Sequence, residues 1–172
     1  MKRIIGLVTA VFLVSVIGIH GQSLTRRSLE GVWKVTEIVT TGAGADKVEN
    51  PRPGLMMFGD KYYSIMYVPS DKERSPFIGD VVTEKEKADA FDSFFANAGT
   101  YELSGTTMTT TPLVAKNPGF EGGGFARFQV RVQGKELWMT SKNTDFSFRK
   151  NGSVVAAGGP ASETTIKLVR VE

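Results

Sequence analysis

Cysteine is absent from this chain of 172 residues, and histidine occurs once, as His20. The missing thiols exclude disulfides, thiol catalysis, cysteine-based metal sites and an acylated N-terminal cysteine. His20 lies in an N-terminal segment that we expect to be removed, which leaves the mature chain without an imidazole. A Ser-His-Asp triad and a histidine-ligated metal are therefore excluded, and we expect neither a metal nor a cofactor.

The long apolar run is confined to the N-terminus and is too short for a membrane anchor. Two basic residues precede the apolar segment 4–19, and Gly21 and Ser23 offer small residues for cleavage. This arrangement is typical of a secretory signal peptide, whereas a spanning helix needs about 20 apolar residues. We predict a signal peptide over 1–23, a single domain over 24–172, and a secreted or periplasmic protein.

The predicted mature chain has little net positive charge. Loss of Lys2 and Arg3 with the leader lowers the formal net charge from +3 to +1, and Arg26-Arg27 is the only adjacent arginine pair. Nucleic-acid binding requires a concentrated basic face. We therefore expect no nucleic-acid partner, no membrane partner after signal cleavage, and a monomer or weak dimer.

Short segments with alternating apolar and polar residues dominate the rest of the chain. In 31–39 the alternation places Trp33, Val35, Glu37 and Val39 on one face, opposite Ile38. Gly-Asp at 59–60 and Asn-Gly at 151–152 predict two-residue hairpins. Eight to ten short strands, mostly linked by hairpins, predict an all-β fold, an antiparallel up-and-down barrel. The further predicted strands are 55–58, 61–68, 100–103, 106–115, 125–132, 136–141, 145–149, 153–156 and 164–171.

One helix interrupts the strands, and we predict it over 84–98, packed at one end of the barrel. Thr83 and Glu86 form a capping box, and Gly99 supplies the terminating position. Apolar residues recur at helical spacing along it, as Ala88, Phe91, Phe95 and Ala98.

Four segments occur in the order and spacing seen in bacterial lipocalin-like domain proteins: 29–33 (LEGVW), 53–56 (PGLM), 98–102 (AGTYE) and 117–122 (NPGFEG). The chain resembles this family from about Ser28 to Val171. The resemblance implies a small antiparallel barrel with an internal cavity. Because the family is mostly uncharacterised, it implies a fold more than an activity.

The resemblance also implies a structural latch. In lipocalins a Gly-x-Trp opens the first strand, and the tryptophan packs against an arginine from the end of the last strand. Gly31 and Trp33 match the first part, and Arg170 is the candidate for the second. A guanidinium on an indole face is a cation–π contact worth about 0.5–2 kcal/mol. Phe120 departs from the family pattern, because a tryptophan usually stands there.

The candidate ligand-binding residues are aromatic or methionine residues on the predicted strands. Such side chains suit an apolar pocket with few polar anchors, and Arg127 would anchor an acidic group if it faced the barrel mouth. The alternative is that the aromatic side chains fill the core, because an eight-stranded barrel has little interior space. The candidates are Tyr63, Tyr67, Tyr101, Met108, Arg127, Phe128 and Trp138.

Three functions remain open at this stage. The first is non-catalytic binding of a small hydrophobic or amphipathic molecule. The second is an isomerase, cyclase or hydratase that uses a glutamate or tyrosine as acid–base, and the third is an interaction module without a ligand. No nucleophile with an identifiable base, phosphate loop or metal-ligand spacing occurs, so the sequence favours binding over catalysis. A carboxylate beside a tyrosine in an open cavity would favour the enzyme, and a filled interior would favour the module.

Overall fold

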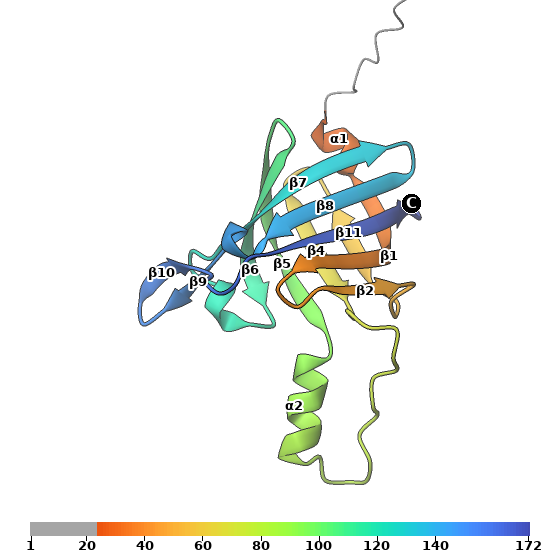
Figure 1. Cartoon of the computed structure of the whole chain (residues 1–172), viewed down its shortest axis with the longest axis vertical. Helices are drawn as coiled ribbons and strands as arrows, with labels where there is room; N and C mark the ends of the chain where they lie inside the picture. Colours follow the sequence, from red (N-terminus) through yellow and green to blue (C-terminus); the bar gives the residue numbers. More distant parts are fainter. Residues whose placement is uncertain (1–23) are drawn as a thin grey trace, which may run out of the picture.

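The computed structural model describes residues 24–172, so the predicted signal peptide lies outside the described residues (Figure 1). Its strands form one antiparallel sheet, of which eight close into a barrel in the order β1-β3-β4-β5-β6-β7-β8-β11 and back to β1. The predicted all-β antiparallel barrel is confirmed. The strands are β1 (Gly31–Gly42), β2 (Asp46–Glu49), β3 (Leu55–Phe58), β4 (Tyr62–Tyr67), β5 (Phe95–Ser104), β6 (Thr107–Ala115), β7 (Phe125–Gln133), β8 (Glu136–Lys142), β9 (Phe146–Lys150), β10 (Ser153–Ala156) and β11 (Ser162–Arg170).

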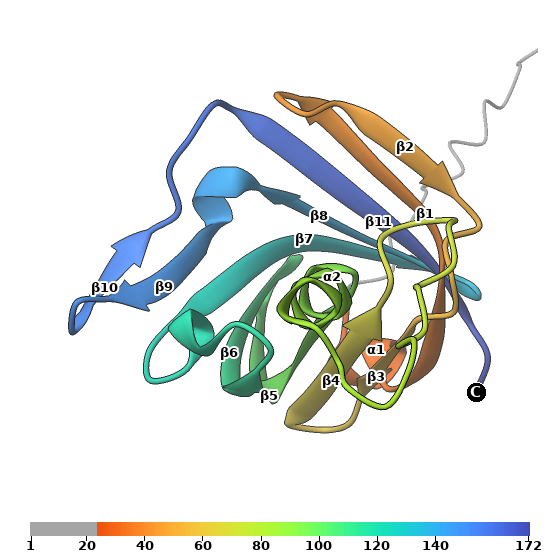
Figure 2. The ribbon, with the colours of Figure 1, turned by 90° about the horizontal axis from the view of Figure 1, so that it is seen from below.

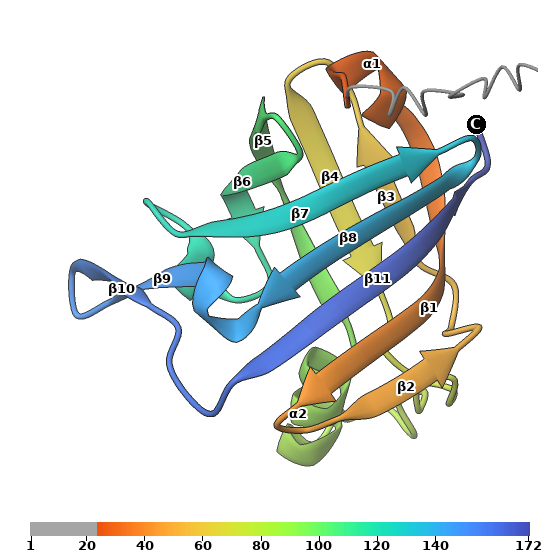
Figure 3. The ribbon, with the colours of Figure 1, turned by 45° about the horizontal axis from the view of Figure 1, so that its top comes forward.

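The remaining elements sit at the ends and edges of the barrel. Helix α1 (Arg26–Leu29) covers one end, where Figure 3 shows it beside the strands. The short 3-10 helices η1 (Pro118–Phe120) and η2 (Asn143–Asp145) flank the β9–β10 hairpin, which continues the sheet from β7. Strand β2 pairs only with β1. These additions leave one end of the barrel covered by α1 and the other bordered by loops.

The two predicted tight turns have different outcomes. Asn151 and Gly152 have positive φ angles of 51° and 82°, as a type I′ turn requires, and join β9 to β10. The Gly59-Asp60 prediction was wrong in length, because Phe58 pairs with Tyr63 across four intervening residues. Neither residue of that pair has a positive φ, so the type I′ conformation does not form there.

A β-bulge in β1 changes which side chains face the core. Val35 pairs with Leu168 and Glu37 with Lys167, so Thr36 is an extra residue in β1. Beyond it the alternation is reversed, and Ile38 is buried. The prediction that Glu37 and Val39 share the face of Trp33 was therefore wrong.

Helix α2 (Glu84–Asp92) ends before the predicted boundary at Ala98. Thr83 and Glu86 do form the capping box, but Phe95 already begins β5, whose pairing with β4 and β6 replaces further helical turns. The Lys116 ammonium donates hydrogen bonds to the carbonyls of Phe91 and Phe94, at the end of the helix. No residue of α2 is buried, and the helix and its preceding loop project as an arm from the barrel (Figure 1). Figure 2 shows the helix nearly end-on.

Candidate functional site

The barrel end under α1 is closed by Trp33 and Arg170. The Trp33 side chain is fully buried and its Nε1 donates to the carbonyl of Leu29 at 2.7 Å. The Arg170 guanidinium lies 4.1 Å from the centre of the Trp33 ring and donates to the carbonyls of Ser28 at 2.6 Å and of Glu30. These contacts join the first turn of the described chain to its last strand.

Gly31 is required at this closed end. Its φ is +125°, and a Cβ there would collide with the carbonyl oxygen of Glu172 and with the Arg170 guanidinium. Only glycine combines this backbone conformation with such a close approach. The three residues of the predicted latch, Gly31, Trp33 and Arg170, therefore meet at one place and hold the structure closed there.

The opposite end of the barrel contains a cavity of about 410 Å³. Its wall combines side chains of β3, β4, β5, β7, β8 and β11 with residues of η1, η2, β9 and the segment after β10. Aromatic, aliphatic and methionine side chains predominate, and no lining residue carries a charge. The lining residues are Met56, Ile65, Tyr67, Phe95, Asn117, Phe120, Phe128, Met139, Ser141, Asn143, Phe146, Phe148, Ala157, Ser162, Thr164 and Ile166.

Four phenylalanines build one side of this cavity. Phe146 meets Phe120 and Phe128 edge to face, with ring centres 6.5 Å and 6.0 Å apart, and Phe148 meets Phe120 in the same way at 6.4 Å. Edge-to-face pairs are a favoured aromatic geometry. Because Phe146 and Phe148 lie two residues apart on β9, the extended backbone presents both rings to the cavity.

The polar side chains of the wall differ in whether they already form hydrogen bonds within the protein. The Asn143 side chain bonds to the carbonyls of Gly159 and Pro160 and accepts from the amide of Ser162, which holds the loops of the mouth together. Thr164 shares a hydroxyl–hydroxyl bond of 3.0 Å with Thr40. Burial raises the pKa of the Tyr67 phenol to about 12, so this hydroxyl stays neutral at physiological pH.

Two of the predicted ligand residues, Tyr67 and Phe128, line the cavity, and three others are buried in the core below it. Tyr63, Tyr101 and Met108 are at most 3% exposed and do not line the cavity. The Tyr101 hydroxyl donates to the carbonyl of Gly59 at 2.7 Å. Burial raises the pKa of Tyr63 to about 12, with the Thr110 hydroxyl opposing the shift. These three side chains fill space, which is the alternative that the sequence left open for them.

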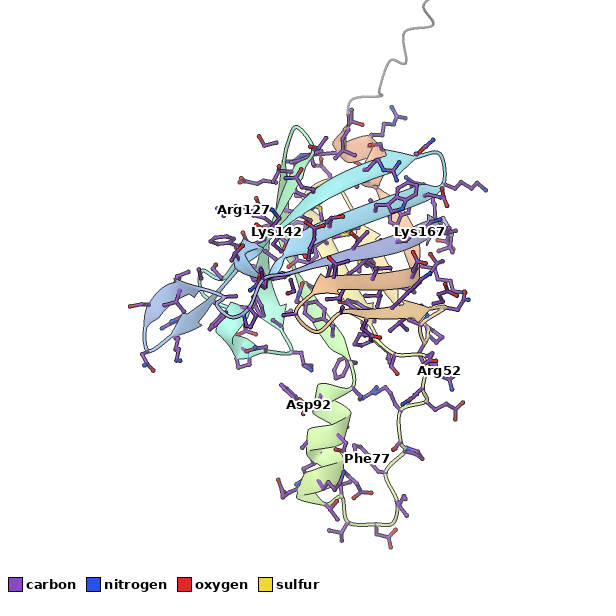
Figure 4. The ribbon with its side chains drawn as sticks, in the orientation of Figure 1. Arg52, Phe77, Asp92, Arg127, Lys142 and Lys167 are labelled. Carbon is purple, nitrogen blue, oxygen red and sulfur yellow. The ribbon has the colours of Figure 1, made fainter. Side chains whose placement is uncertain are left out.

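The other two predicted ligand residues point away from the barrel interior. Arg127 is exposed on the outer face of β7, with its guanidinium 4.3 Å from the centre of the Phe125 ring (Figure 4). Trp138 lies on the outer face of β8, between Arg131 at 3.7 Å and Lys167 at 5.5 Å. Their assignment to the cavity was wrong, because the alternation of each strand directs its neighbours Phe128 and Met139 inward instead.

A larger hollow of about 810 Å³ lies on the outer wall, around Trp138, Arg131 and Thr165, and next to Leu24. It borders the point where the described chain begins. The cation–π contacts of Trp138 already cover this indole, so the hollow does not offer an open aromatic surface. The barrel cavity is therefore the better candidate site.

Several cavity residues were not identified from the sequence. The Phe-x-Phe of Phe146 and Phe148 was a usable signal, because two aromatic residues on one strand face mark an apolar surface. Met139 and Ser141 alternate with Trp138 in the same way, but choosing between the two faces requires the strand pairing. Met56, Ile65 and Ile166 come from strands far apart in the sequence, and only the closed barrel brings them together.

Within residues 24–172, the structure contains no group of acidic side chains placed to hold a metal ion. The same part of the chain contains no helix with the length and apolar character needed to span a bilayer. Comparisons with known protein families, with curated proteins and with solved structures each find no match.

Proposed function

We propose that this protein is an exported, lipocalin-like barrel that binds a small hydrophobic or amphipathic molecule in its cavity without catalysing a reaction. The observation that carries the proposal is the apolar cavity of about 410 Å³ at the barrel end opposite the Trp33–Arg170 closure. Small-molecule sites typically have volumes of about 300–1,000 Å³ and are lined by apolar and aromatic side chains with few polar groups. The latch geometry at the closed end supports the lipocalin-like assignment.

The cavity chemistry favours binding over the enzyme alternative. General acid–base catalysis needs a group whose pKa lies near the working pH. The cavity wall contains no carboxylate, and its one phenol, Tyr67, has a pKa raised to about 12 by burial. The strand glutamates Glu37, Glu102 and Glu136, which could serve as acid–base groups, do not line it. The presence of a cavity also distinguishes this site from the filled interior expected of a module without a ligand.

The proposal is tested with N-phenyl-1-naphthylamine, an uncharged dye whose fluorescence rises in apolar surroundings. We expect saturable binding to residues 24–172, and loss of binding in Ala157→Trp, because Ala157 lines the cavity and an indole there would occupy it. Ala156→Trp is the matched control, since Ala156 is exposed on β10 and does not line the cavity.

Three results would count against the proposal: no saturable binding, equal binding by both tryptophan variants, or a stoichiometry well above one dye per chain. Native mass spectrometry of the protein purified from its own compartment provides an independent measurement. A mass excess that disappears on extraction with organic solvent, and that is smaller in Ala157→Trp, would identify a bound natural ligand.

A further inference from the structure

The cavity wall includes a serine hydroxyl that makes no hydrogen bond to the rest of the described protein. Ser141 is 6% exposed, faces inward from β8 and lines the cavity. Within residues 24–172 the structure gives its Oγ no hydrogen-bond partner. Ser147, an equally buried serine on β9, differs because its Oγ accepts from the amide of Phe125 at 3.1 Å. The Oγ atom of Ser141 is open to the cavity and not sealed within the wall, so Ser141 is available to a ligand.

The cavity also lacks a cation. The arginine expected to meet an acidic ligand, Arg127, lies outside the barrel, and none of the lining residues is lysine or arginine. A carboxylate in an apolar cavity without a cation would lose its hydration and gain no compensating charge. An alcohol hydroxyl is uncharged, and it can either donate a hydrogen bond to the Ser141 hydroxyl or accept one from it.

We propose that the cavity selects an uncharged apolar molecule that carries a hydroxyl group, with Ser141 as its hydrogen-bonding partner, and discriminates against the corresponding carboxylic acid. This inference rests on the proposed function, because it names the class of ligand that the same cavity binds. It replaces the expectation that an arginine anchors an acidic ligand.

The test is competition for bound N-phenyl-1-naphthylamine by three molecules of one chain length: decanol, decanoic acid and decane. At neutral pH we expect decanol to displace the dye at a concentration roughly 10-fold or more below that of decanoate, because the anion is desolvated without a partner. Ser141→Ala should weaken decanol by about 3- to 10-fold, the effect of one hydrogen bond, and leave decane unchanged. Ser147→Ala, outside the cavity wall, should leave the preference for decanol over decane unchanged.

The outcomes separate this inference from the proposed function. Dye binding with equal displacement by decanol and decanoate would overturn the inference and leave the binding function standing. It would mean that the polar end of the ligand reaches water at the mouth. Equal weakening of decanol and decane in Ser141→Ala would remove Ser141 as the hydrogen-bonding partner. Absence of dye binding in the unaltered protein would overturn both.

Discussion

The guanidinium of Arg170 stacks on the indole of Trp33 at 4.1 Å, and the same two residues are directly paired between β1 and β11. The contact therefore joins side chains and backbone at one position. Two charge-assisted hydrogen bonds from Arg170 to the carbonyls of Ser28 and Glu30 extend it to α1. The barrel is thus closed and capped by a single group of residues.

Trp33→Ala should destabilise the fold by about 3–5 kcal/mol, because it removes a fully buried aromatic side chain and leaves a cavity at the closed end. The free energy of unfolding in urea measures the effect. A loss below about 1 kcal/mol would contradict the role of Trp33 in the core.

Arg170→Ala should cost about 2–4 kcal/mol, because two backbone carbonyls lose charged donors in addition to the stacking. Arg131→Ala is the matched control, since Arg131 stacks on Trp138 at 3.7 Å on the outer surface and makes no comparable bonds to backbone carbonyls. We expect a loss of at most about 1 kcal/mol there. Equal losses for the two variants would show that stacking alone accounts for the effect of Arg170.

The β-bulge at Thr36 predicts unequal effects for two neighbouring residues. Ile38→Ala should destabilise the protein by about 2–4 kcal/mol, because Ile38 is buried in the core. Val39→Ala should cost about 1 kcal/mol or less, because Val39 lies on the other face of β1 and outside the core cluster. Urea unfolding of both variants measures the two losses, and a larger loss for Val39→Ala would contradict a bulge at Thr36.

The buried phenols predict a loss of stability at alkaline pH. Burial raises the pKa values of Tyr63 and Tyr67 from 10.0 to about 12 in the folded state. Between these two pH values the folded protein therefore binds more protons than the unfolded chain. The contribution of the two tyrosines to the free energy of unfolding is fully present below pH 10 and is lost as pH rises to 12. The double variant Tyr63→Phe, Tyr67→Phe should show a flatter dependence. Ultraviolet titration in which every tyrosine ionises near its ordinary pKa would contradict this prediction.

The capping box of α2 predicts a separate change in acid. The Thr83 hydroxyl and the amides of Ile78 and Thr83 lower the pKa of Glu86 to about 2. Because the pKa in the folded state lies below the usual value of 4.5, this contribution to helix stability is complete above pH 4.5 and is lost as pH falls toward 2. NMR titration of the Glu86 carboxyl carbon measures the midpoint. Thr83→Ala should move that midpoint upward, and an unchanged midpoint would exclude the hydroxyl as its main cause.

The strand pattern made the barrel predictable, because inward and outward residues alternate in most strands and the connections are short. Local residues also predicted the start of α2, where Thr83 and Glu86 act within one turn. The helix end was not predictable from Phe95 and Ala98, because their spacing suits a helix while their pairing with β4 decides for a strand. The face of Ile38 depends on one extra residue in a pair of strands distant in sequence, so local alternation could not show it.

The site was less predictable than the fold. Arg127 and Trp138 have the chemistry of ligand-binding residues, but each alternates with an inward neighbour, and residue type alone does not select the face. Which polar residues of the cavity can bind a ligand also depends on which of them are already hydrogen-bonded. Asn143 and Ser141 both line the cavity, but Asn143 is hydrogen-bonded to the loops, whereas Ser141 is available to a ligand. Such differences arise from contacts between distant strands and loops.

The pairing of β1 with β11 has a consequence for biogenesis. Trp33 finds its partner Arg170 only after all the other barrel strands have been synthesised. Until then a growing chain has unpaired edges on β1 and β8, both of which pair with β11 in the finished barrel. Exposed strand edges promote association between chains. This barrel can therefore close only when synthesis of the chain is complete. A chain that stops short of β11 would keep two unpaired strand edges, at which chains could associate.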